Sequence, residues 1–179
     1  MDFGKFVPGL GQEMFQQIRE SIYQQILWEH IMYSVKVGIF AGLVITVVGM
    51  IVGKLRLSSL DLTTYTGCML TGRNKGTAPF VAGFLFHIIM SAVLGVVYLY
   101  LIYTFKIPGT LLYGLSLGVL HTFFSGSCML VLDVINPCTR NKMVPYVGFM
   151  GTAQGMSSVL AYASVHILFA MIVLMLLTH

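Results

Sequence analysis

Long apolar runs separated by short polar stretches dominate this chain. Four runs reach the length of about 20 residues that a helix needs to cross the hydrocarbon core of a membrane. They cover residues 31–52, 79–104, 109–135 and 154–177. Between them, glycine, proline and polar residues gather at 71–76, 107–109 and 136–142, and such residues interrupt helices. The pattern predicts an all-α, polytopic membrane protein with four transmembrane helices.

The segment before the first run has a different pattern. Between Gly11 and Glu29, apolar residues recur at steps of three and four, at Phe15, Ile18, Ile22 and Ile26, and glutamine and charged residues fill much of the rest. This spacing predicts an amphipathic helix that either lies in the membrane interface or docks on a partner subunit. We therefore expect an N-terminal amphipathic segment, residues 1–30, followed by a four-helix domain, residues 31–179.

Composition supports the membrane assignment. Hydrophobic residues make up 57% of the 179 residues and charged residues only 9%, whereas soluble domains carry about a quarter charged residues. A soluble globular enzyme and a disordered chain are therefore excluded. The formal net charge is +4, but the basic residues are scattered and form no stripe with aromatic residues, so nucleic acid is not an expected partner.

The distribution of basic residues predicts an orientation, because cytoplasmic loops are enriched in Lys and Arg. The loop after the second apolar run contains only Lys106. The two longer connections contain the rest of the loop cations: Lys54, Arg56, Arg73, Lys75, Arg140 and Lys142. We expect both longer connections in the cytoplasm and both termini outside.

The cysteines are Cys68, Cys128 and Cys138. Their number is odd, their spacing is uneven, and no CxxC pair occurs. The sequence therefore predicts neither a disulfide framework nor a cysteine-rich zinc site.

Small residues in two of the runs predict close helix packing. Helices in lipid gain contact energy where small residues let their backbones approach. The candidate packing positions are Gly38, Gly42, Gly49, Gly53, Gly114 and Gly118. We expect them mainly to pack helices of this chain together, with a second copy or a foreign helix as the alternative.

Three histidines, His87, His121 and His166, fall inside the apolar runs and in one broad layer of the membrane. Polar side chains at this depth are costly and mark functional sites by default. A small residue lies about one turn before each histidine, which would leave a flat face for a haem or chlorin ring. Ser91 and Ser125 each follow a histidine by four residues and could orient a ring N–H.

These histidines admit four interpretations. Three imidazoles could bind a metal, with Cys128 or Met129 as a further ligand. One or two histidines could hold a tetrapyrrole, with His87 and His166 as the preferred pair at one depth of the membrane. Each could instead make a simple interhelical hydrogen bond. Finally, a histidine could transfer protons with Asp61 or Asp133.

The spacing of these residues resembles a known group of proteins. The second run reads Gly83-x3-His87-x7-Gly95-x2-Tyr98, preceded by Leu60-Asp61-Leu62 and Gly67-x4-Gly72, and followed by Gly114-x3-Gly118 and the single His166. From Val37 to Leu177 the chain resembles small four-helix bacterial inner-membrane proteins related to the YagU-like group. It departs from that pattern in its N-terminal helix and at Met171 and Val173. The resemblance implies the fold and a bacterial inner membrane but brings no activity.

The sequence contains no HExxH motif and no phosphate-binding glycine loop. We therefore expect a non-enzymatic accessory subunit of a larger membrane complex, such as a respiratory or photosynthetic one, with lipid and other membrane proteins as partners. The alternative function is an intramembrane site on His87, His121 and His166 that binds a haem, a chlorin or a metal for electron transfer or metal handling.

Overall fold

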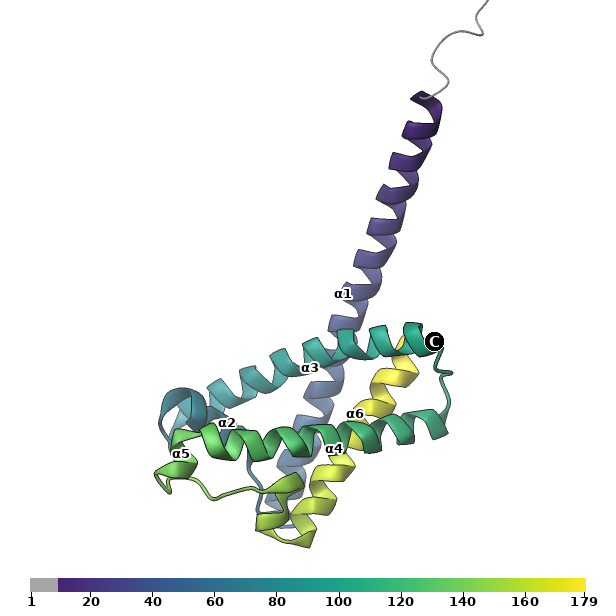
Figure 1. Ribbon diagram of the computed structural model, residues 1–179. Helices are drawn as coiled ribbons and strands as arrows, with labels where there is room; N and C mark the ends of the chain where they lie inside the picture. The colour runs from purple at the N-terminus through teal and green to yellow at the C-terminus, as the bar shows by residue number, and fades with distance from the viewer. Residues whose placement is uncertain (1–9) are drawn as a thin grey trace, which may run out of the picture. The chain divides into compact units, whose positions relative to one another are not determined.

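The computed structural model describes residues 10–179, with side chains from Phe15 onward. The elements are α1 (Leu10–Lys54), α2 (Leu62–Thr71), α3 (Thr77–Phe105), α4 (Leu111–Ile135), α5 (Pro137–Arg140), the 3₁₀ helix η2 (Phe149–Gln154) and α6 (Met156–Thr178) (Figure 1). No strand occurs within residues 10–179. The predicted all-α class is confirmed.

Four of these helices are long and apolar enough to cross a membrane: Phe15–Lys54, Thr77–Phe105, Leu111–Ile135 and Met156–Thr178. The chain is therefore a multi-pass membrane protein, as predicted. The last span begins two residues later than expected because Gly155 adopts a positive φ of 95° before α6. A left-handed residue of this kind ends one helix and redirects the chain into the next.

The separate amphipathic helix expected in residues 1–30 is not confirmed. Residues 1–9 lie outside the described part of the chain, and from Leu10 onward the segment belongs to α1, which continues to Lys54. No glycine or proline occurs between Gly11 and Gly38, so nothing in the sequence interrupts the helix. The chain divides into two compact units, Met1–Tyr33 and Ser34–His179, which are described separately.

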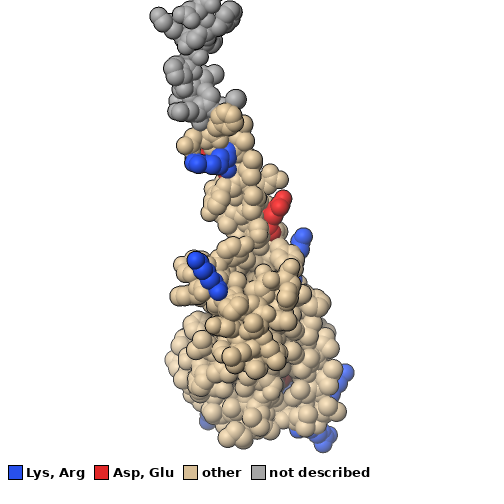
Figure 2. Space-filling view, turned by 90° about the vertical axis from the view of Figure 1, so that its right-hand side faces the viewer, with Lys and Arg blue, Asp and Glu red and all other residues tan. Residues whose placement is uncertain are grey.

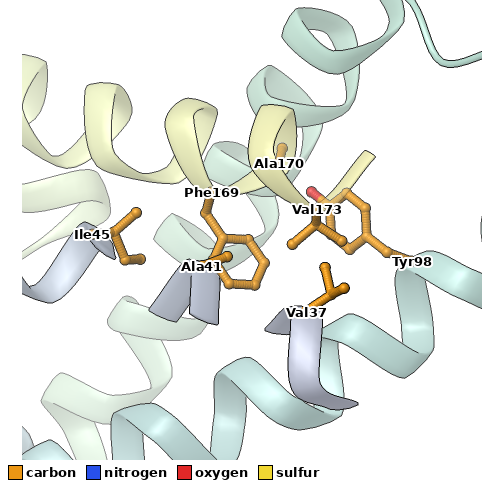
Figure 3. Packing of buried hydrophobic residues seen from close by; sticks show 7 residues of the cluster. All are labelled: Val37, Ala41, Ile45, Tyr98, Phe169, Ala170 and Val173. Atoms are coloured by element: carbon orange, nitrogen blue, oxygen red, sulfur yellow. The ribbon is translucent and has the colours of Figure 1, made fainter. Parts of the chain in front are cut away.

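The Ser34–His179 unit has an apolar core between α1, α3 and α6. Side chains from the three helices point toward one another there (Figure 3). The buried residues are Val37, Ala41, Ile45, Tyr98, Phe169, Ala170 and Val173. Large apolar side chains also cover the outside of this unit, and most of the face shown in Figure 2 carries no charged side chain. This arrangement fits a bundle surrounded by lipid.

Glycines bring the helix backbones of this unit together. A Cβ atom on Gly38 would overlap the Ser91 carbonyl on α3, and one on Gly118 would lie 2.6 Å from Ile167 Cα on α6. A Cβ on Gly42 would overlap the Ser91 side chain, and one on Gly114 would lie 3.3 Å from Met171 Cγ. By contrast, no atom lies within 4 Å of a Cβ placed on Gly49 or Gly53.

A second buried cluster lies at the α2 and α5 end of the unit. It contains Tyr65, Cys68, Met129, Cys138, Val144, Val147 and Tyr162. The short helix α2 forms because Asp61 caps it, with the Thr64 amide donating to the carboxylate at 2.9 Å, and because Gly72 ends it at a φ of 69°. Gly67 and Gly83 let α2 lie directly on α3, since a Cβ on either would overlap backbone of the other helix.

Candidate functional site

The structure places His121 of α4 and His166 of α6 side by side. Their ring centroids are 5.2 Å apart and the rings meet edge to face at 88°. This neighbourhood follows from the glycine contact described above. Gly118 is one turn before His121. Its backbone packs directly against Ile167, the residue after His166. The close approach of the two backbones therefore brings the two imidazoles together.

Hydrogen bonds orient both imidazoles. The Tyr98 hydroxyl and Nδ1 of His121 are 3.1 Å apart, so α3 and α4 are joined across the bundle. Nδ1 of His166 lies 2.7 Å from the Tyr162 carbonyl one turn earlier on α6. Because a carbonyl oxygen only accepts, this Nδ1 carries the proton, and Nε2 of the neutral His166 ring is left as an acceptor.

Aromatic rings fill the space around the pair. Phe169 lies 5.4 Å from His121 between ring centroids, and the Tyr162 ring stacks on His166 at 4.1 Å. A tetrapyrrole held between two histidines needs a layer of space between their rings. The edge-to-face contact of His121 and His166 leaves no such layer, so this pair does not form a bis-histidine haem site in the conformation described.

His87 of α3 is half-buried and takes no part in the ring contact between His121 and His166. No group of three or more His, Cys, Asp or Glu side chains in the described part of the chain has the arrangement of a metal site. The geometry brings His121 and His166 into contact and does not add a third ligand to them.

The other predicted participants lie elsewhere or act differently. Ser91 packs against Gly42 on α1, and the Ser125 hydroxyl donates to the Thr122 carbonyl at 3.2 Å. Cys128 is an exposed free thiol, and Met129 is buried in the second apolar cluster. Asp61 caps α2, as described above. None of these contacts joins the histidine pair.

A second polar site, which sequence reasoning missed, is built around Asp133 in the last turn of α4. The carboxylate is 3% exposed. It accepts a hydrogen bond from the Tyr65 hydroxyl at 2.8 Å. It also accepts from the Val147 amide at 3.1 Å and the Gly148 amide at 2.7 Å. Asp133 therefore fixes α2 and the segment before η2 to the end of α4.

Asn136 extends this site and is fully buried. Its side-chain amide donates to the Tyr65 carbonyl at 3.3 Å, and its side-chain oxygen accepts from the Cys138 amide at 2.9 Å. The signal available in the sequence was an Asp and an Asn three residues apart where an apolar run ends. Such residues are expected to satisfy the free backbone groups of helix ends and loops.

The pKa of Tyr65 is raised to about 12, first because burial disfavours the phenolate and then because of its hydrogen bond to the Asp133 carboxylate. The phenol therefore remains a hydrogen-bond donor across the physiological range. This matters for the site because an ionised carboxylate accepts only, and each donor around Asp133 is needed to offset its burial.

A disulfide joins Cys68 of α2 to Cys138 of α5 next to this site, with the two Cα atoms 6.1 Å apart. The expectation of no disulfide was wrong. It relied on the odd number of cysteines, but Cys128 is the free one. Cys128 lies inside the third apolar run, whereas Cys68 and Cys138 lie outside the runs. That difference was the sequence signal for the pairing.

The comparisons with known proteins bring no further identification. No family model, no curated protein and no solved structure matches the chain. The resemblance to the YagU-like group therefore stays a prediction, and the function must be argued from the residues themselves.

Proposed function

We propose that this chain is a non-enzymatic accessory subunit of a larger membrane complex, located in a bacterial inner membrane. The observation that carries the proposal is the surface of the helical segment 15–30 within the Met1–Tyr33 unit. Its large apolar side chains are uncovered: Phe15 is 71% exposed, Ile22 52% and Ile26 49%. A helix face of this kind needs a cover of lipid or protein.

The charge of this segment favours a protein as the cover. Helices that lie on membranes are rich in Lys and Arg on their polar face, which attracts anionic lipids. From Leu10 to Tyr33 the only Lys or Arg is Arg19, whereas Glu13, Glu20 and Glu29 are acidic, which gives a net charge of 1 − 3 = −2. An anionic lipid surface would repel such a segment. The apolar stripe of a partner's helix would not.

Site-specific photocrosslinking in native membranes tests the proposal. Ile22 lies on the apolar stripe and Gln24 lies nearly opposite, since each residue advances a helix by about 100°. We expect a photoreactive residue at Ile22 to crosslink one membrane protein in good yield, and the same residue at Gln24 to give little of that product. Crosslinking to lipid alone at Ile22 would contradict the proposal.

A second candidate function is ligand binding by the intramembrane histidines, and one observation favours it. A backbone carbonyl that accepts from Nδ1 is the arrangement that orients a ligating imidazole and leaves Nε2 free. His166 has this arrangement. A haem, chlorin or metal bound there would use His166 first, with His87 or His121 as the second residue after local rearrangement.

Absorption spectra and elemental analysis of the purified protein test this second function. His166→Gln should remove a bound pigment or metal. His30→Gln is the matched control, because His30 Nδ1 makes the same bond to the Ile26 carbonyl at 2.7 Å but lies on the exposed part of α1. Equal loss in both variants, or no ligand in the wild-type protein, would refute the second function.

A further inference from the structure

Contacts identify the two ends of the Ser34–His179 unit. At one end, the connection between α3 and α4 meets the end of α6, where a Cβ on Gly109 would overlap the Thr178 hydroxyl. At the other end, the connection containing α2 meets the connection containing α5. There the Asn74 side chain donates to the Met143 carbonyl at 2.7 Å. We call these the turn end and the disulfide end.

Every crossing of the membrane by this unit runs between these two ends. The Lys54 end of α1, the Thr77 end of α3, the Ile135 end of α4 and the Met156 end of α6 all lie at the disulfide end. The Ser59 hydroxyl contacts Gln154 there as well, at 3.3 Å between side chains. Because these connections are joined to one another, the orientation of any one of them sets the orientation of the whole unit.

The disulfide between Cys68 and Cys138 is a marker of compartment. Disulfides form and persist in oxidising compartments, whereas glutathione and thioredoxin keep cytosolic thiols reduced. This disulfide is also well protected, because Cys68 is 0% exposed and Cys138 is 1% exposed. Its surroundings are those of a structural disulfide, since a reactive cysteine pair requires access for an attacking thiolate.

We infer that the disulfide end of the unit faces an oxidising compartment outside the cytoplasm, and that the turn end, with the carboxyl terminus of α6, faces the cytoplasm. This orientation is the reverse of the one that the Lys and Arg count predicts. The six cations of the disulfide end then lie outside, and Lys106 lies inside.

The two criteria differ in kind, which is why we follow the disulfide. The enrichment of Lys and Arg in cytoplasmic loops is a bias on how helices insert, and packing of later helices can overcome it. A disulfide, by contrast, forms only where an oxidant reaches the two thiols, and without one they remain reduced.

The first test counts thiols in native membranes. Cells are quenched in acid, denatured, treated with N-ethylmaleimide to block free thiols, reduced, and then treated with a maleimide–polyethylene glycol. We expect two polymer adducts for the wild-type chain and for Cys128→Ser, and none for Cys68→Ser. A wild-type chain with no adduct holds three free thiols, which would overturn the inference.

The second test measures orientation directly with a matched pair of variants in the Cys128→Ser background. Thr77 at the disulfide end and Thr110 at the turn end are both exposed residues at helix starts. In sealed vesicles with the cytoplasmic face outward, an impermeant maleimide should label Thr110→Cys at once and Thr77→Cys only after detergent is added. The reverse pattern would overturn the inference, whatever the thiol count.

Discussion

A single methyl group added at Gly118 should separate α4 from α6. A Cβ at this position would lie 2.6 Å from Ile167 Cα and 3.1 Å from Ile167 Cβ. Ordinary contacts begin at 3.4 Å, so the two backbones must move apart by 3.4 − 2.6 = 0.8 Å. The atom nearest to the added methyl group, Ile167 Cα, belongs to the backbone and cannot rotate away as a side-chain atom can. Overpacking of this kind costs about 1–3 kcal/mol.

Gly49→Ala provides the matched control, because both glycines lie inside helices but no atom lies within 4 Å of a Cβ at Gly49. Replacing glycine by alanine favours a helix by up to about 1 kcal/mol wherever it is made. That gain is common to both variants and cancels in their difference. We therefore expect Gly118→Ala to be about 1–3 kcal/mol less stable than Gly49→Ala.

Unfolding in mixed micelles of dodecylmaltoside and sodium dodecyl sulfate, followed by circular dichroism, measures both variants. The contact of His121 with His166 offers a second measurement, since separating the helices should weaken it and change the chemical shifts of both imidazoles. Equal stability of the two variants would refute the argument that Gly118 sets the distance between α4 and α6.

Three further predictions concern the polar site and the disulfide. Tyr65→Phe removes a hydrogen bond to a buried carboxylate and should cost about 1.5–3 kcal/mol in micelle unfolding at neutral pH. Folding raises the pKa of Tyr65 from 10.0 to about 12. The contribution of the Tyr65 hydroxyl to the free energy of unfolding is therefore complete below pH 10 and is lost as the pH rises through 12. The difference in stability between wild type and Tyr65→Phe, measured by the same unfolding assay, should shrink over that interval. Asp133→Asn should lower the free energy of unfolding by about 3 kcal/mol or more, because an amide N–H would face the donating Val147 and Gly148 amides. Amide hydrogen exchange at residues 144–148 should also become faster. Unchanged exchange would contradict the described role of Asp133. Cys68→Ser should destabilise by up to about 4 kcal/mol on the chain-entropy argument, and adding Cys138→Ser should cost no more, which unfolding of the single and double variants tests.

The four spans could be predicted because each is a long apolar run with a glycine or proline at or next to one of its ends. The unbroken course of α1 could have been predicted as well, since residues 12–37 contain no helix breaker. The helix α2 was missed because its sequence, LTTYTGCMLT, is short and rich in threonine, which favours helices only weakly. Its caps, Asp61 and Gly72, were the signal that could have located it.

The sites depended on contacts between distant segments, and these were harder to predict. The sequence placed three histidines in one layer, but which of them touch depends on the Gly118 contact with Ile167. The sequence indicated Asp133 only as a candidate for proton transfer with a histidine. Its actual partners, Tyr65 and Gly148, lie on segments whose positions no local pattern specifies.

The 70 residues that separate Cys68 from Cys138 have a consequence for biosynthesis. At about 5–20 residues per second, Cys68 emerges roughly 4–14 s before its partner exists. During that interval Cys128 is made first and is the competing thiol. Insertion of α4 into the bilayer withdraws Cys128 from aqueous oxidants. Prompt insertion of this helix therefore protects the nascent protein from a wrong disulfide between Cys68 and Cys128.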